Sequence, residues 1–436
     1  MSSYLISNAR PEGGEPADLL LRDGVIAAVG PVGTLDVPKG TDVIDAAGAV
    51  ALPGLVDMHT HLREPGHEDA ETVETGTRAA ARGGFTAVFA MANSHPVADT
   101  AGVVEQVWQL GRDAGWCDVH PVGAVTVGLG GTQLSEIRAM AESRAGVRMF
   151  SDDGKCVHDP VLMRRALEYV KSFGGIIAQH AQEPRLTEGA QMNEGAVSAD
   201  LGLTGWPAVA EEAIIARDVL LTQHVDSRLH ICHLSTKGSV DIVRWAKERG
   251  VAVTAEVTPH HLLLTDELVR TFDPVYKVNP PLRTDEDVQA LRRAVAEGTI
   301  DVIGTDHAPH TAEDKECEWS CAAHGMTGLE TALAVVQSTL VDTGLIGWER
   351  VAQIMSRTPA RILGLTDQGQ ELAPGATANI VLWEPSGQTP VDPTIHASKG
   401  RNSPYRGMTL PGGVRATFYR GHPVVRDGEP ATPLTR

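Results

Sequence analysis

The sequence has few cysteines and a deficit of positive charge. Five cysteines in 436 residues form an odd, sparse set, which argues against a disulfide framework and predicts reduced thiols. Lysine and arginine number 37 against 56 aspartate and glutamate, so the formal net charge is −19 with histidine neutral. Because a phosphate-binding surface needs clustered cations, this balance argues against nucleic acid and anionic membranes as partners.

Long hydrophobic runs are also missing. No run reaches the ~18 apolar residues that span a bilayer, and the N-terminal segment lacks a basic region followed by an apolar one. We therefore expect a soluble chain in the cytoplasm, without a membrane partner. Cys317 and Cys321 lie four residues apart, but no second ligand pair at similar spacing lies nearby, so they are interpreted as loop thiols rather than a zinc knuckle.

What the sequence does contain is a repeated alternation of strand-like and helix-like segments. Eight apolar runs end in polar residues, at 50–61, 85–93, 118–126, 146–153, 174–180, 228–233, 251–261 and 300–310. Segments with helical spacing lie between most of them, such as ETVETGTRAAA, PVLMRRALEYV, EEAIIARDVLL and SVDIVRWAKE. This pattern predicts an α/β protein with a parallel (β/α)₈ TIM-like barrel, whose strands are buried on both faces.

The two ends of the chain read differently from the middle. Short strand-like pieces such as YLISNAR and DLLLRDGVIAAVG precede the barrel, and ANIVLWEP and VRATFYRGHPVV follow it. Neither end could bury a β face alone. We expect residues 1–52 and 366–436 to combine into one small β-sandwich domain beside a catalytic barrel over residues 53–365.

Polar side chains gather at the ends of the predicted strands. Histidine, aspartate or asparagine closes seven of the eight runs, and active sites of this fold are built at the carboxyl ends of the strands. His59 and His61 alternate along one strand, which places both imidazoles on the same side. Later strands add further candidate ligands, namely Asp153, His180, His233 and Asp306. Four imidazoles and two carboxylates can hold two divalent ions, typically zinc, with one carboxylate bridging.

The motifs that carry these residues resemble a known family. In chain order they are PGLVDMHTHLREPG, FSDDG, AQHA, ICHLSTKGS, EVTPHH, NPPLR and TDHAPH. As a set they are similar to the amidohydrolase superfamily, and specifically to its bacterial type I dihydroorotases. The resemblance runs through nearly the whole chain.

The resemblance implies a role for each candidate ligand. His59 and His61 would bind one metal, His180 and His233 would bind the other, and Asp153 would bridge the two. Asp306 would be both a ligand and the proton carrier. Asp152 and Lys155 are alternatives for the bridge, since related enzymes use a carboxylated lysine there; Asp153 is preferred because it falls at the position that the type I enzymes use.

The implied reaction is the reversible cyclisation of N-carbamoyl-L-aspartate to L-dihydroorotate, a step of pyrimidine biosynthesis. In the hydrolytic direction a metal-bound hydroxide would attack the ring amide, with Asp306 as general base and then general acid. Arg63 would grip the carboxylate of this small anionic substrate. The other substrate-binding positions would be His61, Asn93, Asn279, His310, His324 and Gly325, while His260 and His261 would support the site without binding metal.

Two places depart from the family pattern. The proline of the family's M-P-N-T motif is replaced by Ala92, although Asn93 stays. A Phe-Gly pair becomes His324-Gly325, after the unusual stretch TAEDKECEWSCAA at 311–323. We expect this loop to act as a lid that excludes water from the substrate. With these changes, the sequence does not specify the conformation of the closed lid.

Other functions are weighed against this one. Allantoinase and dihydropyrimidinase share the barrel and the histidine pair, but a neutral ring substrate has no need of Arg63. Inactive chains of the family serve as structural partners of aspartate transcarbamoylase, yet such chains typically lose metal ligands. All six are present here. The sequence therefore favours an active enzyme and is compatible with a homodimer and with a transcarbamoylase assembly.

Overall fold

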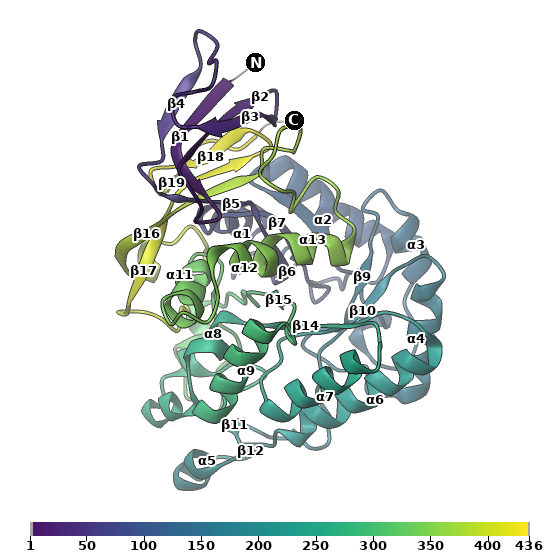
Figure 1. Ribbon diagram of the computed structural model, residues 1–436. Helices are drawn as coiled ribbons and strands as arrows, with labels where there is room; N and C mark the ends of the chain where they lie inside the picture. Colours follow the sequence, from purple (N-terminus) through teal and green to yellow (C-terminus); the bar gives the residue numbers. More distant parts are fainter. Residues whose placement is uncertain (1–2, 435–436) are drawn as a thin grey trace.

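The computed structural model describes residues 3–434 of the chain. Eight short strands form the centre of its larger part. Figure 1 shows strands of this group surrounded by helices. They are β6 (Leu55–Thr60), β7 (Phe85–Ala90), β8 (Asp118–Pro121), β9 (Met149–Phe150), β10 (Ile176–Gln179), β13 (Leu229–Ile231), β14 (Val253–Val257) and β15 (Val302–Ile303). Each lies within one of the eight predicted runs, and the predicted α/β class is confirmed.

All neighbours among these strands are parallel. One sheet has the order β6-β7-β8 and a second has the order β9-β10-β13-β14-β15. Single parallel bridges join the two sheets at both edges, from Gly123 to Phe150 and from Thr60 to His307. The carboxyl ends of all eight strands therefore lie on the same side.

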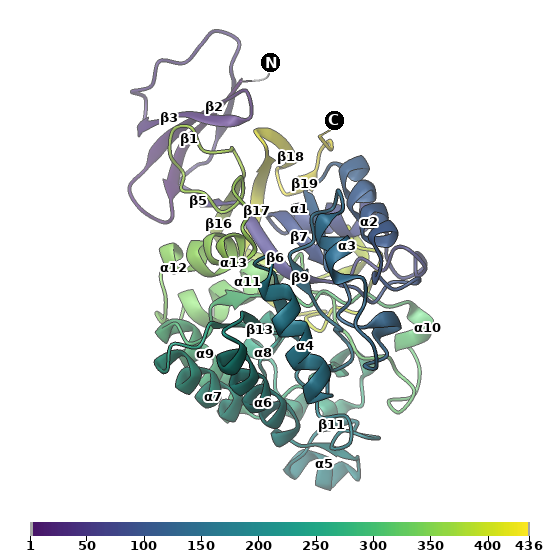
Figure 2. The ribbon, with the colours of Figure 1, turned by 90° about the vertical axis from the view of Figure 1, so that its right-hand side faces the viewer.

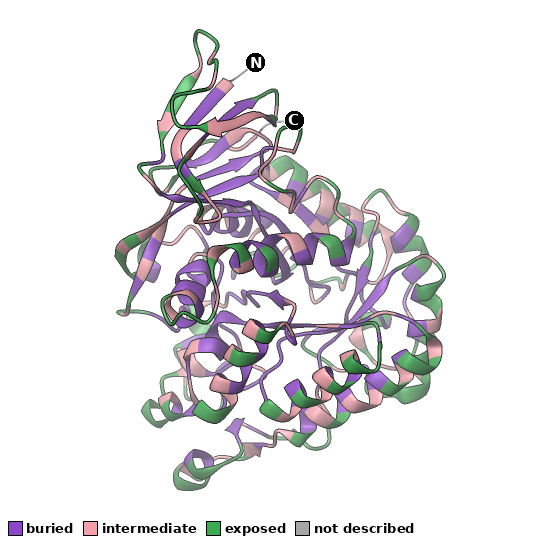
Figure 3. Ribbon diagram, in the orientation of Figure 1, coloured by how far each residue is buried: buried purple, intermediate pink, exposed green. Residues whose placement is uncertain are grey.

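Helices connect consecutive strands and cover them. They are α1 (Val73–Arg82), α2 (Ala101–Ala114), α3 (Ile137–Glu142), α4 (Pro160–Lys171), α6 (Val209–Val225), α7 (Lys237–Glu248), α9 (Asp285–Glu297), α11 (Ala332–Val336), α12 (Trp348–Ala352) and α13 (Thr358–Leu363). The four segments with helical spacing lie in α1, α4, α6 and α7, which confirms them. Figure 3 shows buried strands and helices with green outer faces, as an amphipathic pattern dictates.

Both chain ends contribute to one nine-stranded sheet. Its members are β1 (Ser3–Pro11), β2 (Ala17–Arg22), β3 (Val25–Pro31), β4 (Asp42–Asp45), β5 (Val50–Pro53), β16 (Ile380–Pro390), β17 (Thr409–Tyr419), β18 (His422–Arg426) and β19 (Glu429–Pro430). β5 pairs with β16, and β1 links them to the other N-terminal strands. One apolar core, including Ile6, Leu21, Ile380 and Phe418, joins side chains from both ends. Figure 2 shows this sheet at one end of the molecule, away from α5.

Several shorter elements lie in the loops after the strands. They are β11 (Met192–Asn193), α5 (Ala196–Leu201), β12 (Gly205–Trp206), α8 (Pro259–Leu263) and α10 (Ala312–Lys315). The five cysteines are free thiols, as predicted. Within residues 3–434 none of the helices has the length and apolar character required to cross a bilayer.

Candidate active site

The six predicted metal ligands meet at the carboxyl ends of the strands. His59 lies in β6 with His61 just beyond it, and the others directly follow β9, β10, β13 and β15. All six side chains belong to residues that are at most 5% exposed. Because parallel strands end at one edge, residues far apart in the sequence are brought into one buried cluster.

Asp153 lies at the centre of this cluster. Its Oδ1 is 3.3 Å from His59 Nε2, 3.3 Å from His180 Nδ1 and 3.3 Å from His233 Nε2. Its Oδ2 is 3.3 Å from His61 Nε2. One carboxylate therefore faces all four imidazoles.

Asp306 faces the histidine pair of the first strand. Its Oδ1 is 3.1 Å from His61 Nε2 and 3.4 Å from His59 Nε2. Asp153 and Asp306 thus flank the same two nitrogens, and of these two carboxylates only Asp153 also contacts His180 and His233.

The outer nitrogens of three imidazoles are held by acceptors. His59 Nδ1 is 2.5 Å from Glu256 Oε1, and His61 Nδ1 is 2.9 Å from Asn93 Oδ1. His180 Nε2 is 2.8 Å from Gln182 Oε1. Because each acceptor needs a proton on the nitrogen it faces, the opposite nitrogen of each ring, on the side of Asp153, is the one through which a metal ion would be bound.

This donor set fits divalent cations. His180 Nδ1 and His233 Nε2 lie only 2.9 Å apart, and His59 Nε2 is buried without a hydrogen-bond partner among residues 3–434. Two groups of three ligand atoms, His59-His61-Asp153 and Asp153-His180-His233, each lie within 4.8 Å of one another. Imidazole and carboxylate together suit zinc and similar ions.

Burial and charge compete at these side chains. Burial raises the pKa of the Asp153 carboxyl, but His59, His180 and His233 outweigh it and hold that pKa well below its usual range. Burial acts the same way on Asp306, and His59 and His61 bring its pKa to about 2. Burial lowers the pKa of His59, whereas the carboxylates of Asp153 and Glu256 raise it, and the net shift is upward. Both aspartates therefore carry negative charge at neutral pH.

Backbone strain marks three of the candidate residues. Arg63, His233 and Asp306 have φ values of 63°, 31° and 46°, a left-handed region that residues other than glycine rarely adopt. Such conformations persist only where surrounding contacts impose them, and they cluster at functional sites.

Asp57 makes contacts that help to impose these backbone conformations. Its carboxylate accepts bonds from the backbone N–H of His59 at 3.2 Å and of Thr305 at 2.9 Å. It also accepts a bond from the Thr305 hydroxyl at 2.5 Å. This buried side chain ties β6 to the residue before Asp306, which keeps His59 and Asp306 side by side.

The alternative bridging residues lie elsewhere. Asp152 accepts bonds from the backbone N–H groups of Val125 at 2.8 Å and Thr126 at 3.0 Å, so its carboxylate is engaged away from the imidazoles. Lys155 is exposed. The structure brings Asp153 into the cluster and leaves Asp152 and Lys155 out of it.

The predicted substrate residues line the same end of the barrel strands. Arg63 Nε donates to the backbone carbonyl of Pro309 at 3.0 Å, and its Nη2 lies 3.4 Å from His310 Nε2. Asn279 Nδ2 donates at 3.1 Å to Gln182 Oε1, which also faces His180. Asn93 contacts His61, as described above. Asn93 therefore contacts a predicted metal ligand, Asn279 contacts a neighbour of one, and Arg63 contacts the predicted substrate residue His310.

Two buried lysines, one of them within the loop itself, donate hydrogen bonds to backbone carbonyls of the loop at 311–325. Lys277 Nζ donates to the carbonyl of Trp319 at 2.7 Å, and Lys315 Nζ donates to those of Ala323 at 2.9 Å and Gly325 at 3.1 Å. The neighbouring His324 carbonyl is 2.9 Å from His310 Nε2. These contacts place the predicted pair His324-Gly325 against His310.

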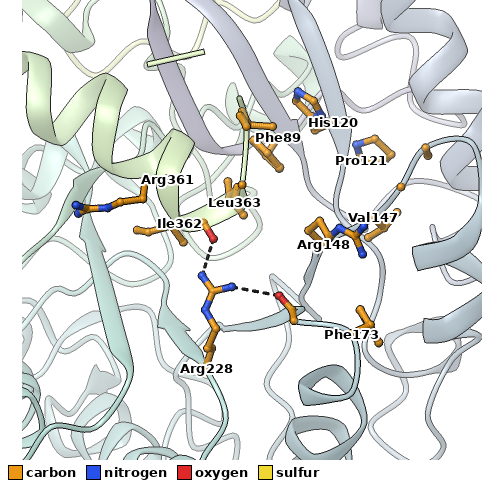
Figure 4. Close-up of a pocket in the computed structure, with 15 residues that line it drawn as sticks. Phe89, His120, Pro121, Val147, Arg148, Phe173, Arg228, Arg361, Ile362 and Leu363 are labelled. Atoms are coloured by element: carbon orange, nitrogen blue, oxygen red, sulfur yellow. Dashed lines mark hydrogen bonds between the residues drawn. The ribbon is translucent and has the colours of Figure 1, made fainter. Parts of the chain in front are cut away.

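Two cavities lie at opposite ends of the barrel strands. One of about 650 Å³ lies beside the loop and includes His310 and Lys315 in its lining. Another of about 510 Å³ lies at the opposite, amino ends of the strands, where Arg228 donates to Gly174 and Ile362 (Figure 4). None of the predicted metal ligands lines either cavity, but the first has the predicted substrate residue His310 in its lining.

Comparison with known proteins shows the family of the chain. Residues 48–239 match the family described as Dihydro-orotase-like. The chain is 65% identical over 429 residues to the dihydroorotase of Streptomyces coelicolor, covering 98% of this chain and 100% of that protein. It is 54% identical over 428 residues to the dihydroorotase of Mycobacterium tuberculosis, covering 98% and 99%. The chain belongs to the dihydroorotase family.

Solved structures of related enzymes share the fold of this dihydroorotase family member. The L-hydantoinase (dihydropyrimidinase) of Arthrobacter aurescens superposes with a TM-score of 0.87 at 26% identity, covering 99% of this chain and 98% of that one. The dihydropyrimidinase of Brevibacillus agri NCHU1002 gives a TM-score of 0.85 at 24% identity, covering 99% and 97%. At 24% identity, the similarity to the second structure shows a shared fold and nothing more.

Sequence reasoning missed two residues of this family member's site. Glu256 opens the motif EVTPHH, in which only the two histidines were predicted to support the site. His261 contacts another residue: its Nδ1 is 2.7 Å from Thr258 Oγ1. Gln182 follows AQHA and had no signal beyond its nearness to His180. A buried strand residue with a charged side chain was the available signal for Glu256.

Proposed function

We propose that this chain is a dihydroorotase that interconverts N-carbamoyl-L-aspartate and L-dihydroorotate. The observation that carries the proposal is the convergence of four imidazole nitrogens on Asp153, with the opposite nitrogens of three rings held by acceptors. The full-length similarity to named dihydroorotases supports the choice of reaction.

The residues around the cluster divide the work. When bound, divalent metals supply an activated water and polarise the amide carbonyl. Asp306, whose Oδ1 is 3.1 Å from His61 Nε2, takes the proton of the attacking water and delivers it to the leaving ring nitrogen. Arg63 binds the substrate carboxylate, and the loop at 311–325 excludes water from the site. Asn93, Asn279 and His310 orient the substrate.

The proposal extends to the metals and to the architecture. Two zinc ions per chain are supported by two ligand groups that share Asp153. The two bridges between the sheets support a closed (β/α)₈ barrel. The pairing of β5 with β16 and the common core of the terminal strands support a sandwich-like domain from residues 1–52 and 366–436, with the barrel over 53–365.

A substrate panel with a metal assay tests the proposal. Purified protein is given dihydroorotate, allantoin and hydantoin before and after chelation, and metal content is measured in parallel. We expect turnover of dihydroorotate alone, loss of that turnover on chelation and its return with Zn²⁺. Turnover of hydantoin without dihydroorotate would assign the chain to the alternative enzymes, and activity in demonstrably metal-free protein would refute the mechanism.

Replacing Arg63 by methionine should weaken substrate binding. A lost bond between charged groups costs about 1.5–3 kcal/mol, so KM for dihydroorotate should rise about 10- to 100-fold. Steady-state kinetics check this, with metal content expected to stay at the wild-type value. Arg148→Met is the control, because this exposed arginine lines the cavity at the opposite end, and its KM should change by less than a factor of about two. An Arg63 variant with unchanged KM would remove Arg63 from the site.

A further inference from the structure

Glu256 is a buried carboxylate to which the proposed reaction gives no role. It is 1% exposed and lies in β14, which pairs with β13 and β15. Figure 1 shows β14 beside β15. Within residues 3–434 its ion pairs are with two histidines and with no lysine or arginine. A buried charge is stable only where hydrogen bonds compensate it, so its partners show what it does.

The two carboxylate oxygens of Glu256 have different partners. Oε1 is 2.5 Å from His59 Nδ1 and accepts the backbone N–H of His233 at 3.2 Å. Oε2 is 3.1 Å from His230 Nε2. His230 is itself fixed, because its Nδ1 is 2.9 Å from Thr254 Oγ1. One carboxylate thus touches a predicted ligand from each of the two groups, and a fixed histidine holds its other side.

The neighbouring backbone is shaped around this carboxylate. A Cβ on Gly304 would lie 2.6 Å from Glu256 Oε2, closer than atoms can approach. Glycine at 304 therefore leaves the space in which the carboxylate lies, and any side chain there would displace it. The position of Glu256 depends on residues from β13, β14 and the end of β15.

Contact with an anionic acceptor decides the tautomer of His59. A proton on Nδ1 satisfies Glu256 and leaves the lone pair on Nε2. That nitrogen lies 3.3 Å from Asp153 and 3.4 Å from Asp306, and no residue in the described range 3–434 forms a hydrogen bond with it. A carboxylate on the far nitrogen also makes an imidazole a stronger ligand.

We infer that Glu256 is a positioning residue that sets the tautomer and orientation of His59 and joins the two ligand groups through the His233 backbone. The inference rests on the proposed metal site. It differs from the assignment of Glu256 as a ligand, which the proximity of His59, Cys232 and Glu256 would also allow.

The variant Glu256→Gln tests this role with little change in shape. We expect the affinity for Zn²⁺, measured by competition with a chelator, to fall about 10- to 100-fold, and kcat to fall by a similar factor. KM for dihydroorotate should stay within a factor of about two, since Arg63 and Asn279 are untouched. The visible spectrum of the Co²⁺-substituted variant should differ from that of the wild type.

Asp218→Asn is the matched control. Asp218 is 0% exposed and bonds to Gln179 at 2.7 Å and to Arg217, so it tests the loss of a buried charge away from the ligands. Its metal affinity and Co²⁺ spectrum should match the wild type. If Glu256→Gln does not fold, His230→Gln decides: it frees one side of the carboxylate, and Zn²⁺ affinity should fall by a smaller factor.

The outcomes separate the two proposals. A wild type that binds no metal or leaves dihydroorotate unchanged refutes the proposed function. An active wild type with a Glu256→Gln variant of equal Zn²⁺ affinity and unchanged spectrum refutes the positioning role. Loss of one whole equivalent of metal with unchanged affinity for the rest would make Glu256 a ligand, which also overturns the inference.

Discussion

Replacing Asp153 by asparagine should abolish both metal binding and turnover. The amide keeps the shape of the carboxylate but removes the negative charge that faces four imidazole nitrogens at 3.3 Å. We expect kcat/KM for dihydroorotate to fall at least about 10⁴-fold, equivalent to about 5.5 kcal/mol of transition-state stabilisation. Bound zinc should fall from about two to less than one per chain. Steady-state kinetics and elemental analysis of the same samples check this.

Asp152→Asn provides the matched control. It removes the adjacent carboxylate, whose bonds go to Val125 and Thr126 rather than to the imidazoles. Its metal content should equal that of the wild type, and any loss should be of thermal stability. If the two variants exchanged these results, Asp152 would be the bridge; full metal content and activity in Asp153→Asn would exclude Asp153.

The second large effect is expected for Asp306→Asn. An asparagine cannot accept and return a proton, and a positioned general acid–base group contributes about 10²- to 10⁴-fold to rate. We expect kcat to fall by that factor while KM changes little, because Arg63 remains. Kinetics with metal analysis separate this loss from the metal loss of Asp153→Asn, since the other five ligands remain.

Asp314 offers a control for charge alone. This half-exposed carboxylate lies 3.9 Å from His310 Nδ1, outside the cluster. Asp314→Asn should change kcat by no more than a factor of about two. An Asp306→Asn variant that kept wild-type kcat would contradict the proton-carrier role, whatever its metal content.

The local pattern of apolar and polar residues predicted many of the strands and helices. The apolar runs that became β6 and β10 are continuous because parallel strands are buried on both faces, and α4 and α7 follow from apolar residues at helical spacing. The pairing of β5 with β16 was foreseen only as a combination of the chain ends. Its order and register depend on contacts between residues more than 300 positions apart, which no local period encodes.

The candidate ligands were also visible in the sequence, but their supports were not. His59 and His61 stand out because alternation along a strand places them on one side. Glu256 and Gln182 become recognisable only when β14 and the loop after β10 lie beside the imidazoles. Likewise, the contacts of Lys277 and Lys315 with backbone carbonyls of the loop at 311–325 are visible only in the tertiary structure.

By itself the sequence determined the alternation of strands and helices and the residue types at the strand ends, because both are properties of neighbouring positions. The tertiary structure alone decided which nitrogen of each histidine faces Asp153, which carboxylate is central and which residues contact the loop at 311–325. Those choices depend on the direction of side chains from several strands, and direction is set by packing and by hydrogen bonds across the sheet.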